Sequence, residues 1–138
     1  MHMNTENATH SPLTDGLGSD CPMTRLLAIL SAKWSLPVLY QLMVADGPVR
    51  FGALKKSIAV ITQRELSRAL RQFEHLGLVT RRAYAEVPPK VEYTLTDLGR
   101  SIHQPILALG QWAKDHAEEL KAAEAKFAAA EELVKSPV

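Results

Sequence analysis

The pattern of apolar and polar residues predicts one dominant helix over residues 61–78. At about 100° per residue, its apolar side chains gather on one side of the helix: Leu66, Ala69, Leu70 and Phe73. The opposite side is basic: Arg64, Arg68, Arg71 and His75. Thr62 and Glu65 have the spacing of a capping box at the start, and Gly77 suits the left-handed residue that closes a helix. We therefore expect a helix that packs by one face and presents guanidinium groups on the other.

Three shorter helices are expected before this stretch. The first begins at Pro22, after Asp20 and Cys21, and its apolar run ends near Ala32. Ser35 is a candidate cap for the second, which ends at Gly47-Pro48 and is predicted to turn four side chains inward: Leu36, Leu39, Tyr40 and Met43. Residues 49–51 look extended, and residues 51–58 suit a third helix with Leu54 and Ile58 inward and Lys55 and Lys56 outward. This short helix followed by residues 61–78 predicts a helix-turn-helix arrangement.

A β-hairpin is expected after the basic helix, from strands at residues 79–84 and 91–96. Pro88-Pro89 would hold the connection extended, although paired prolines also occur in ordinary loops. Arg81, Arg82 and Lys90 give the hairpin a positive charge suited to phosphates or to a minor groove. A hairpin in this place predicts the wing of a winged helix-turn-helix domain.

The C-terminal part of the sequence predicts a long helical region that Thr96 caps. Pro105 should bend or split it near Ser101, because proline lacks the amide that would bond that carbonyl. Apolar residues then recur every seven positions: Ala113, Leu120, Phe127 and Val134. So narrow a seam on a helix of about 25 residues indicates a partner subunit. The alternative is an alanine-rich tail helix that makes no contacts.

Composition limits the classes of protein to consider. The 138 residues are 46% hydrophobic and 22% charged, as in an ordinary globular domain, and no apolar run is long enough to span a membrane. A single cysteine allows no internal disulfide, which favours the cytoplasm. No pattern of residues suggests a catalytic site or a cofactor, and His2 and His10 are too isolated for a metal site. We therefore expect a flexible tail at residues 1–19, a winged domain at residues 20–110 and a dimerisation helix at residues 111–138, and no enzyme.

The small net charge of +1 conceals an asymmetry. From Arg50 to Lys90 there are nine lysines and arginines against three glutamates, a local balance of +6, and the remainder of the chain carries −5. A basic middle within an acidic frame is typical of a protein with one face directed at a polyanion. A basic helix face is also common on surfaces that bind nothing.

The sequence resembles the HxlR-type winged helix-turn-helix regulators of bacteria over residues 20 to about 113. The resemblance rests on several motifs in one order: Cys21-Pro22, Lys33-Trp34, Gly47-Pro48 with Arg50-Phe51 and Leu54, Leu66-Ser67 with Leu70-Arg71 and Glu74, Gly77-Leu78-Val79, Pro88-Pro89 with Val91-Glu92-Tyr93, and Leu95-Thr96 before Gly99. It implies a homodimer built on the terminal helices, with two basic helices entering successive major grooves of a pseudo-palindromic operator. The chain departs from the pattern at Ser31-Ala32, Ala53 and Lys90, which should alter local packing and wing contacts.

The candidate site residues fall into three groups. We expect four side chains to approach base edges: Gln63, Arg64, Ser67 and Arg68. Four more are expected to hold phosphates of double-stranded DNA: Thr62, Arg71, Arg81 and Lys90. Five are candidates for the dimer interface: Leu26, Leu109, Trp112, Leu120 and Phe127.

The controlling signal is open at the level of sequence. The resemblance implies sensing of an oxidant or electrophile through Cys21, whose place at a helix N-terminus favours the thiolate. The negative charge of Asp20 beside it disfavours the thiolate. With one cysteine in the chain, a disulfide would have to join two subunits. The alternative signal is a small-molecule effector in a cleft at the dimer interface, near Trp34, Tyr40 or Trp112, although such aromatics are often simply core. Either way, we expect a DNA-binding transcriptional regulator, most simply a repressor.

Overall fold

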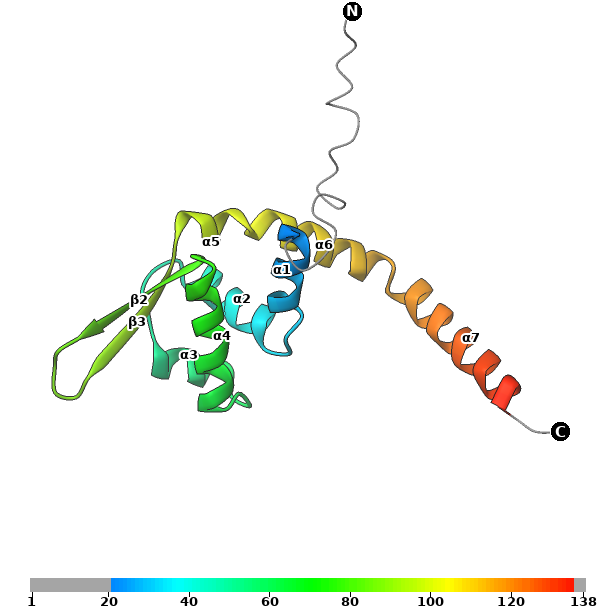
Figure 1. The fold of residues 1–138 in the computed structure, drawn as a ribbon, viewed down its shortest axis with the longest axis horizontal. Coiled ribbons are helices and arrows are strands. Elements are labelled where there is room, and N and C mark those ends of the chain that lie inside the picture. Colours follow the sequence, from blue (N-terminus) through cyan, green and yellow to red (C-terminus); the bar gives the residue numbers. More distant parts are fainter. Residues whose placement is uncertain (1–20, 136–138) are drawn as a thin grey trace, which may run out of the picture. The chain divides into compact units, whose positions relative to one another are not determined.

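The computed structural model describes residues 21–135. The predicted flexible tail, with His2 and His10, lies outside the described residues. Contacts divide the chain into two units that part between Arg100 and Ser101, whereas the sequence placed a boundary after residue 110. The elements in chain order are α1 Pro22–Leu30, α2 Ser35–Ala45, β1 Val49–Arg50, α3 Phe51–Ser57, α4 Gln63–His75, β2 Val79–Tyr84, β3 Lys90–Leu95, α5 Asp97–Ser101, α6 His103–Asp115 and α7 Ala117–Lys135 (Figure 1). The expected mainly helical fold with a small hairpin is confirmed.

Helix α4 follows the sequence prediction closely. The amide of Glu65 donates to Thr62 Oγ1 and the amide of Thr62 donates to Glu65 Oε1, both at 3.1 Å, which completes the capping box. At the other end Gly77 has φ +74°, and the amides of Gly77 and Leu78 donate to carbonyls of the last helical turn. The predicted apolar side of α4 is buried throughout. Local signals in the sequence therefore set both ends and the packed face of this helix.

The hairpin belongs to a three-stranded antiparallel sheet in the order β1-β3-β2. The extended residues expected at 49–51 form β1, which pairs Val49 with Tyr93 in β3. Strand β3 begins at Lys90, one position earlier than expected. Strands β2 and β3 extend away from the helices of the first unit, as a wing does (Figure 1).

The core of the first unit lies among α2, α3, α4 and the sheet. Its buried side chains are Val38, Leu39, Leu42, Leu54, Ile58, Ile61, Leu66, Ala69, Leu70, Phe73, Leu78, Val79, Tyr93 and Leu95. The inward positions predicted for α3, Leu54 and Ile58, are confirmed. A single core that draws on both helices of the pair and on the wing fixes α4 relative to the sheet.

Two predictions for α2 are wrong. Of the four inward positions expected, only Leu39 is buried; Leu36 is 46% and Tyr40 61% exposed, while the core takes Val38 and Leu42 instead. Ser35 does not cap the helix, because its buried hydroxyl donates to the carbonyl of Ile29 at 2.6 Å. The helix is apolar on nearly every side, so its sequence does not single out one buried face.

Helix α5 begins where the sequence predicted. Thr96 Oγ1 accepts from the amide of Gly99 at 3.0 Å, and the hydroxyl donates to the carbonyl of Gly77. A Cβ at Gly99 would lie 2.1 Å from the carbonyl oxygen of Leu78, so only glycine fits this approach. The break expected from Pro105 falls at Ile102, between α5 and α6.

The second unit differs from the single long helix expected. A further break at His116 separates α6 from α7, and His116 Nδ1 lies 2.9 Å from the carbonyl oxygen of Trp112 while the two rings stack. The seven-residue seam therefore spans two helices, with Ala113 on α6 and Leu120, Phe127 and Val134 on α7. Among the described residues, no single helix is long and apolar enough to cross a membrane; α1 and α2 pass that test only as a pair bent by 89°.

Candidate nucleic-acid interface

The basic face of α4 is exposed as a unit. Arg64, Arg68, Arg71 and His75 are all exposed, on the side of the helix opposite its buried residues. The ion pairs formed between residues 21 and 135 involve none of them. Arg64 and Arg71 are separated by roughly 10 Å along the helix axis, about the length of three base pairs. The three guanidinium groups therefore lie together on the exposed side of α4, as the sequence predicts.

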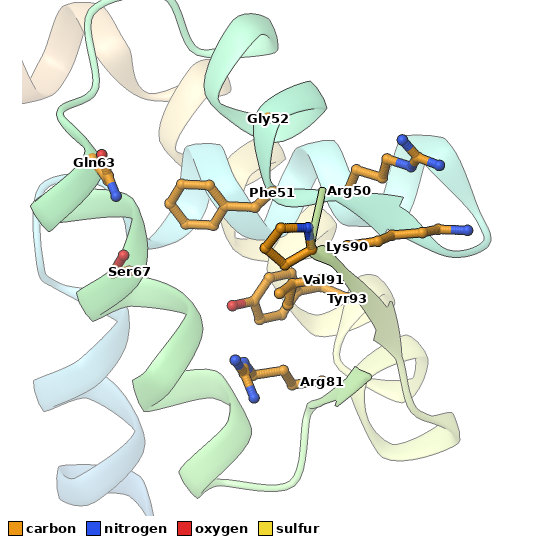
Figure 2. A pocket seen from close by; sticks show the side chains of 10 residues that line it. Arg50, Phe51, Gly52, Gln63, Ser67, Arg81, Lys90, Val91 and Tyr93 are labelled. Carbon is orange, nitrogen blue, oxygen red and sulfur yellow. The ribbon is translucent and has the colours of Figure 1, made fainter. Parts of the chain in front are cut away.

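A groove of about 520 Å³ separates the start of α4 from the wing. Gln63 and Ser67 line it from α4, and Phe51 points into it from the start of α3 (Figure 2). The strand register pairs Arg81 with Tyr93, which places both side chains on the face of the sheet directed toward α4. The groove thus brings together two predicted base-reading residues, Gln63 and Ser67, and two predicted phosphate ligands, Arg81 and Lys90.

The groove continues along α4 as a second hollow of about 380 Å³. Arg71 and Glu74 line this part from the helix, and Arg81 and Tyr93 line it from the sheet. The two hollows share Ser67, Arg81 and Tyr93, and the second has Arg71 on the helix wall and Arg81 on the sheet wall, beside the carboxylate of Glu74. A hollow with cations on both walls suits the phosphate backbone of a duplex.

Lys90 also lines the groove, but the strand register puts its side chain on the other face of the sheet. Its ammonium group pairs with Glu92 at 2.9 Å and sits 4.7 Å from the centre of the Tyr84 ring, which Arg82 also covers. In Figure 2, Lys90 and Arg50 point away from α4, whereas Arg81 points toward it. The hydrogen bond from Lys90 is the main cause that lowers the pKa of Glu92, so this cation is already partly neutralised. The two predicted phosphate ligands of the wing are therefore not equivalent.

A smaller cleft of about 310 Å³ lies on the opposite flank of α4. Arg68 and Gln72 line it from the helix, and Lys33 and Trp34 line it from the junction between α1 and α2. The indole Nε1 of Trp34 donates a hydrogen bond to Glu65 Oε2. Hydrogen bonds from Thr62, with a smaller one from Trp34, lower the pKa of the Glu65 carboxyl. Arg68 is thus set between the exposed face of α4 and this cleft.

Several residues of the groove were not singled out from the sequence. Phe51 and Gly52 enter it because β1 pairs with β3 and leads directly into α3. Tyr93 enters it through the register of β3, and its ring lies 6.4 Å from that of Phe51. Alternation along a strand assigns Tyr93 to one face of β3, but only the pairing of distant strands shows what that face meets.

The candidates for signal and assembly differ in exposure. Cys21 is 3% exposed at the N-cap of α1, so its thiol is covered rather than presented to solvent. Of the proposed interface residues, Leu26 is partly exposed; Leu109, Trp112, Leu120 and Phe127 are exposed in the single chain, Phe127 to 67%. Trp34 and Tyr40 are not core residues either, since Trp34 is partly exposed and Tyr40 is exposed.

Comparison with known proteins places these features in a family. Residues 29–121 match the family described as HxlR-like helix-turn-helix. The HTH-type transcriptional regulator YdeP of Bacillus subtilis is 42% identical over 106 residues, which are 75% of this chain and 81% of that protein. The reduced form of the regulator YodB from B. subtilis is 31% identical, with a TM-score of 0.63 over 72% of this chain and 96% of that one. The reduced form of the redox regulator HypR is 35% identical, with a TM-score of 0.63 over 73% and 98% of the two chains.

Proposed function

Since this chain belongs to the HxlR-like helix-turn-helix family and is a winged-helix transcriptional regulator, we propose that it recognises a defined double-stranded DNA sequence through the arginine face of α4. The observation that carries the proposal is the exposure of Arg64, Arg68 and Arg71 opposite a fully buried stripe. Arginine is the commonest bidentate partner of guanine in the major groove, and α4 has the length to reach about three base pairs.

The groove between α4 and the wing supplies the backbone contacts in this proposal. With α4 in the major groove, a phosphate strand runs between Arg71 on the helix and Arg81 on β2. Gln63 and Ser67 then face the bases nearest the wing, and Arg64 and Arg68 face those beneath the helix. Contacts to phosphate set the position of α4, and contacts to base edges set the sequence.

A homodimer completes the site in this proposal. The exposed Leu120, Phe127 and Val134 of α7 have the seven-residue spacing of a helical interface, and a second copy is the partner that a symmetric operator requires. Two α4 helices would then bind half-sites about 34 Å apart. A dimer bound across a promoter would act as a repressor by excluding the polymerase.

The experiment is a selection from randomised duplexes followed by titration of the enriched sequence. Wild-type protein should enrich a pseudo-palindrome and bind it much more tightly than random DNA. Arg64→Ala should cost about 1–3 kcal/mol on the enriched duplex and relax the preference at one base position. No enrichment, or equal losses on enriched and random DNA, would refute the base-reading role of α4.

Control by oxidation of Cys21 is a second part of the proposal. It is supported by the likeness to HypR, named a redox regulator, and to YodB, described in a reduced form. Two Cys21 thiols from two subunits would lose two protons and two electrons to diamide, forming one disulfide and the hydrazine product. Because the thiol is buried, this reaction requires α1 to open locally. Operator affinity that is unchanged after diamide, with the thiol shown to be oxidised, would remove this control.

A further inference from the structure

One carboxylate joins the start of α4 to the junction between α1 and α2. Glu65 Oε1 accepts from the amide of Thr62 at 3.1 Å, which belongs to the capping box. Glu65 Oε2 accepts from the indole N–H of Trp34, which lies 31 positions earlier in the chain. The two oxygens of a single side chain thus serve a local cap and a tertiary contact.

The Trp34 end of this link is itself held in place. Its carbonyl oxygen accepts from the amide of Val38 at 3.1 Å, inside the first turn of α2. The next residue, Ser35, is 1% exposed and its hydroxyl donates to the carbonyl of Ile29 near the end of α1. The ammonium nitrogen of Lys33 lies 5.0 Å from the centre of the indole ring. The indole N–H is therefore offered from a position that two helices define.

The start of α4 needs such an anchor. The first turn of a helix has amides without helical partners and frays most easily. This turn carries Gln63 and Arg64, whose contacts to bases would tolerate little displacement. Buried side chains flank this turn at Ile61 and Leu66, whereas Gln63 and Arg64 themselves are exposed and have no core packing.

We propose that Trp34 is a positioning residue that fixes the first turn of α4 through Glu65, so that sequence discrimination depends on this hydrogen bond. The inference rests on the proposed DNA recognition by α4. A first turn that is already ordered avoids part of the entropy loss of binding. Of the expected phosphate contacts, only that of Thr62 lies beside the anchor; those of Arg71 and Arg81 come from another turn and from the sheet, so binding to arbitrary DNA depends on the anchor far less.

The decisive variant is Trp34→Phe, which keeps an aromatic ring and removes the N–H donor. Fluorescence anisotropy should show about three- to tenfold weaker binding to the enriched duplex and unchanged binding to random DNA, the loss expected for one hydrogen bond. The same substitution in a Glu65→Ala background should cause no further loss, because Trp34 acts through that carboxylate. Gln72→Ala, which alters the same cleft without touching Glu65, is the matched control and should keep wild-type affinity.

The outcomes separate this inference from the proposed function. Wild-type protein without sequence preference would refute both. If Trp34→Phe keeps the full sequence preference of the wild type, the inference alone is refuted. It is also refuted if Trp34→Phe weakens binding to the enriched duplex equally with Glu65 present and with Glu65→Ala, or if Gln72→Ala weakens that binding as much as Trp34→Phe does. If Trp34→Phe loses its helical circular dichroism, Glu65→Gln is tested instead. A glutamine side chain has only one oxygen, so it cannot accept from both the Thr62 amide and the Trp34 indole on separate oxygens, as Glu65 does. Undiminished discrimination by Glu65→Gln would then overturn the inference.

Discussion

The two faces of the wing predict different contributions of Arg81 and Lys90 to the salt dependence of DNA binding. Arg81 faces the groove beside α4, with no ion pair to any residue from 21 to 135. Lys90 lies on the other face and is paired with Glu92 at 2.9 Å. A phosphate can therefore engage Arg81 directly, whereas it has to compete with a carboxylate for Lys90.

The size of the effect follows from counterion release. Each neutralised phosphate changes the slope of log K against log salt by about 0.9, so one contact is worth about 3.5-fold in affinity between 50 and 200 mM salt. Arg81→Gln should lower the slope by about one. The matched control is Lys90→Gln combined with Glu92→Gln, which removes a cation and an anion together and should change the slope by less than about 0.3.

The assay is anisotropy titration of one duplex at four or more salt concentrations, on the enriched sequence and on random DNA. Both duplexes should report the same change for Arg81→Gln, because phosphate contacts carry no sequence information. An unchanged slope for Arg81→Gln, or an equal fall for the Lys90 and Glu92 double variant, would refute this assignment of the two wing faces.

Three further predictions concern stability and assembly. Gly99→Ala should lower the free energy of unfolding by about 3 kcal/mol, because its Cβ would lie 2.1 Å from the Leu78 carbonyl oxygen. Urea denaturation measures this loss, and an unchanged free energy of unfolding would contradict the prediction. The pKa of Glu65 is lowered in the folded state, so its contribution is complete above the ordinary value of 4.5 and is lost as the pH falls through the lowered pKa. Glu65→Gln should therefore flatten the acid limb of a plot of Tm against pH, and an identical limb would count against the capping role. Phe127→Glu should convert a dimer to monomers in sedimentation, and a persistent dimer would place the interface elsewhere.

Local signals explain why α4 could be predicted almost completely. Its cap, its closing glycine and its apolar stripe all lie within one continuous stretch, so no distant contact was needed to define them. The break before α6 is also set by a local signal, because Pro105 predicts it. The break at His116 has no proline or glycine, and a contact with Trp112 accompanies it, so no local signal predicts it.

Features that depend on distant pairing were missed or misassigned. Helix α2 is apolar on nearly every side, and only packing against α4 and β3 selects Val38 and Leu42 over Leu36. Arg81 and Lys90 both stay predicted phosphate ligands, but the strand register, which the sequence does not reveal, places their side chains on opposite faces of the sheet. The link from Trp34 to Glu65 joins two motifs that sequence reasoning had treated separately.

The most direct test of the account is the effect of Arg64→Lys on the enriched and the random duplex. The substitution keeps the positive charge and removes the bidentate fork that matches guanine. We predict a loss of about 1–3 kcal/mol on the enriched duplex and unchanged affinity for random DNA. Full retention of sequence preference, or an equal loss on both duplexes, would contradict the claim that the exposed face of α4 recognises bases.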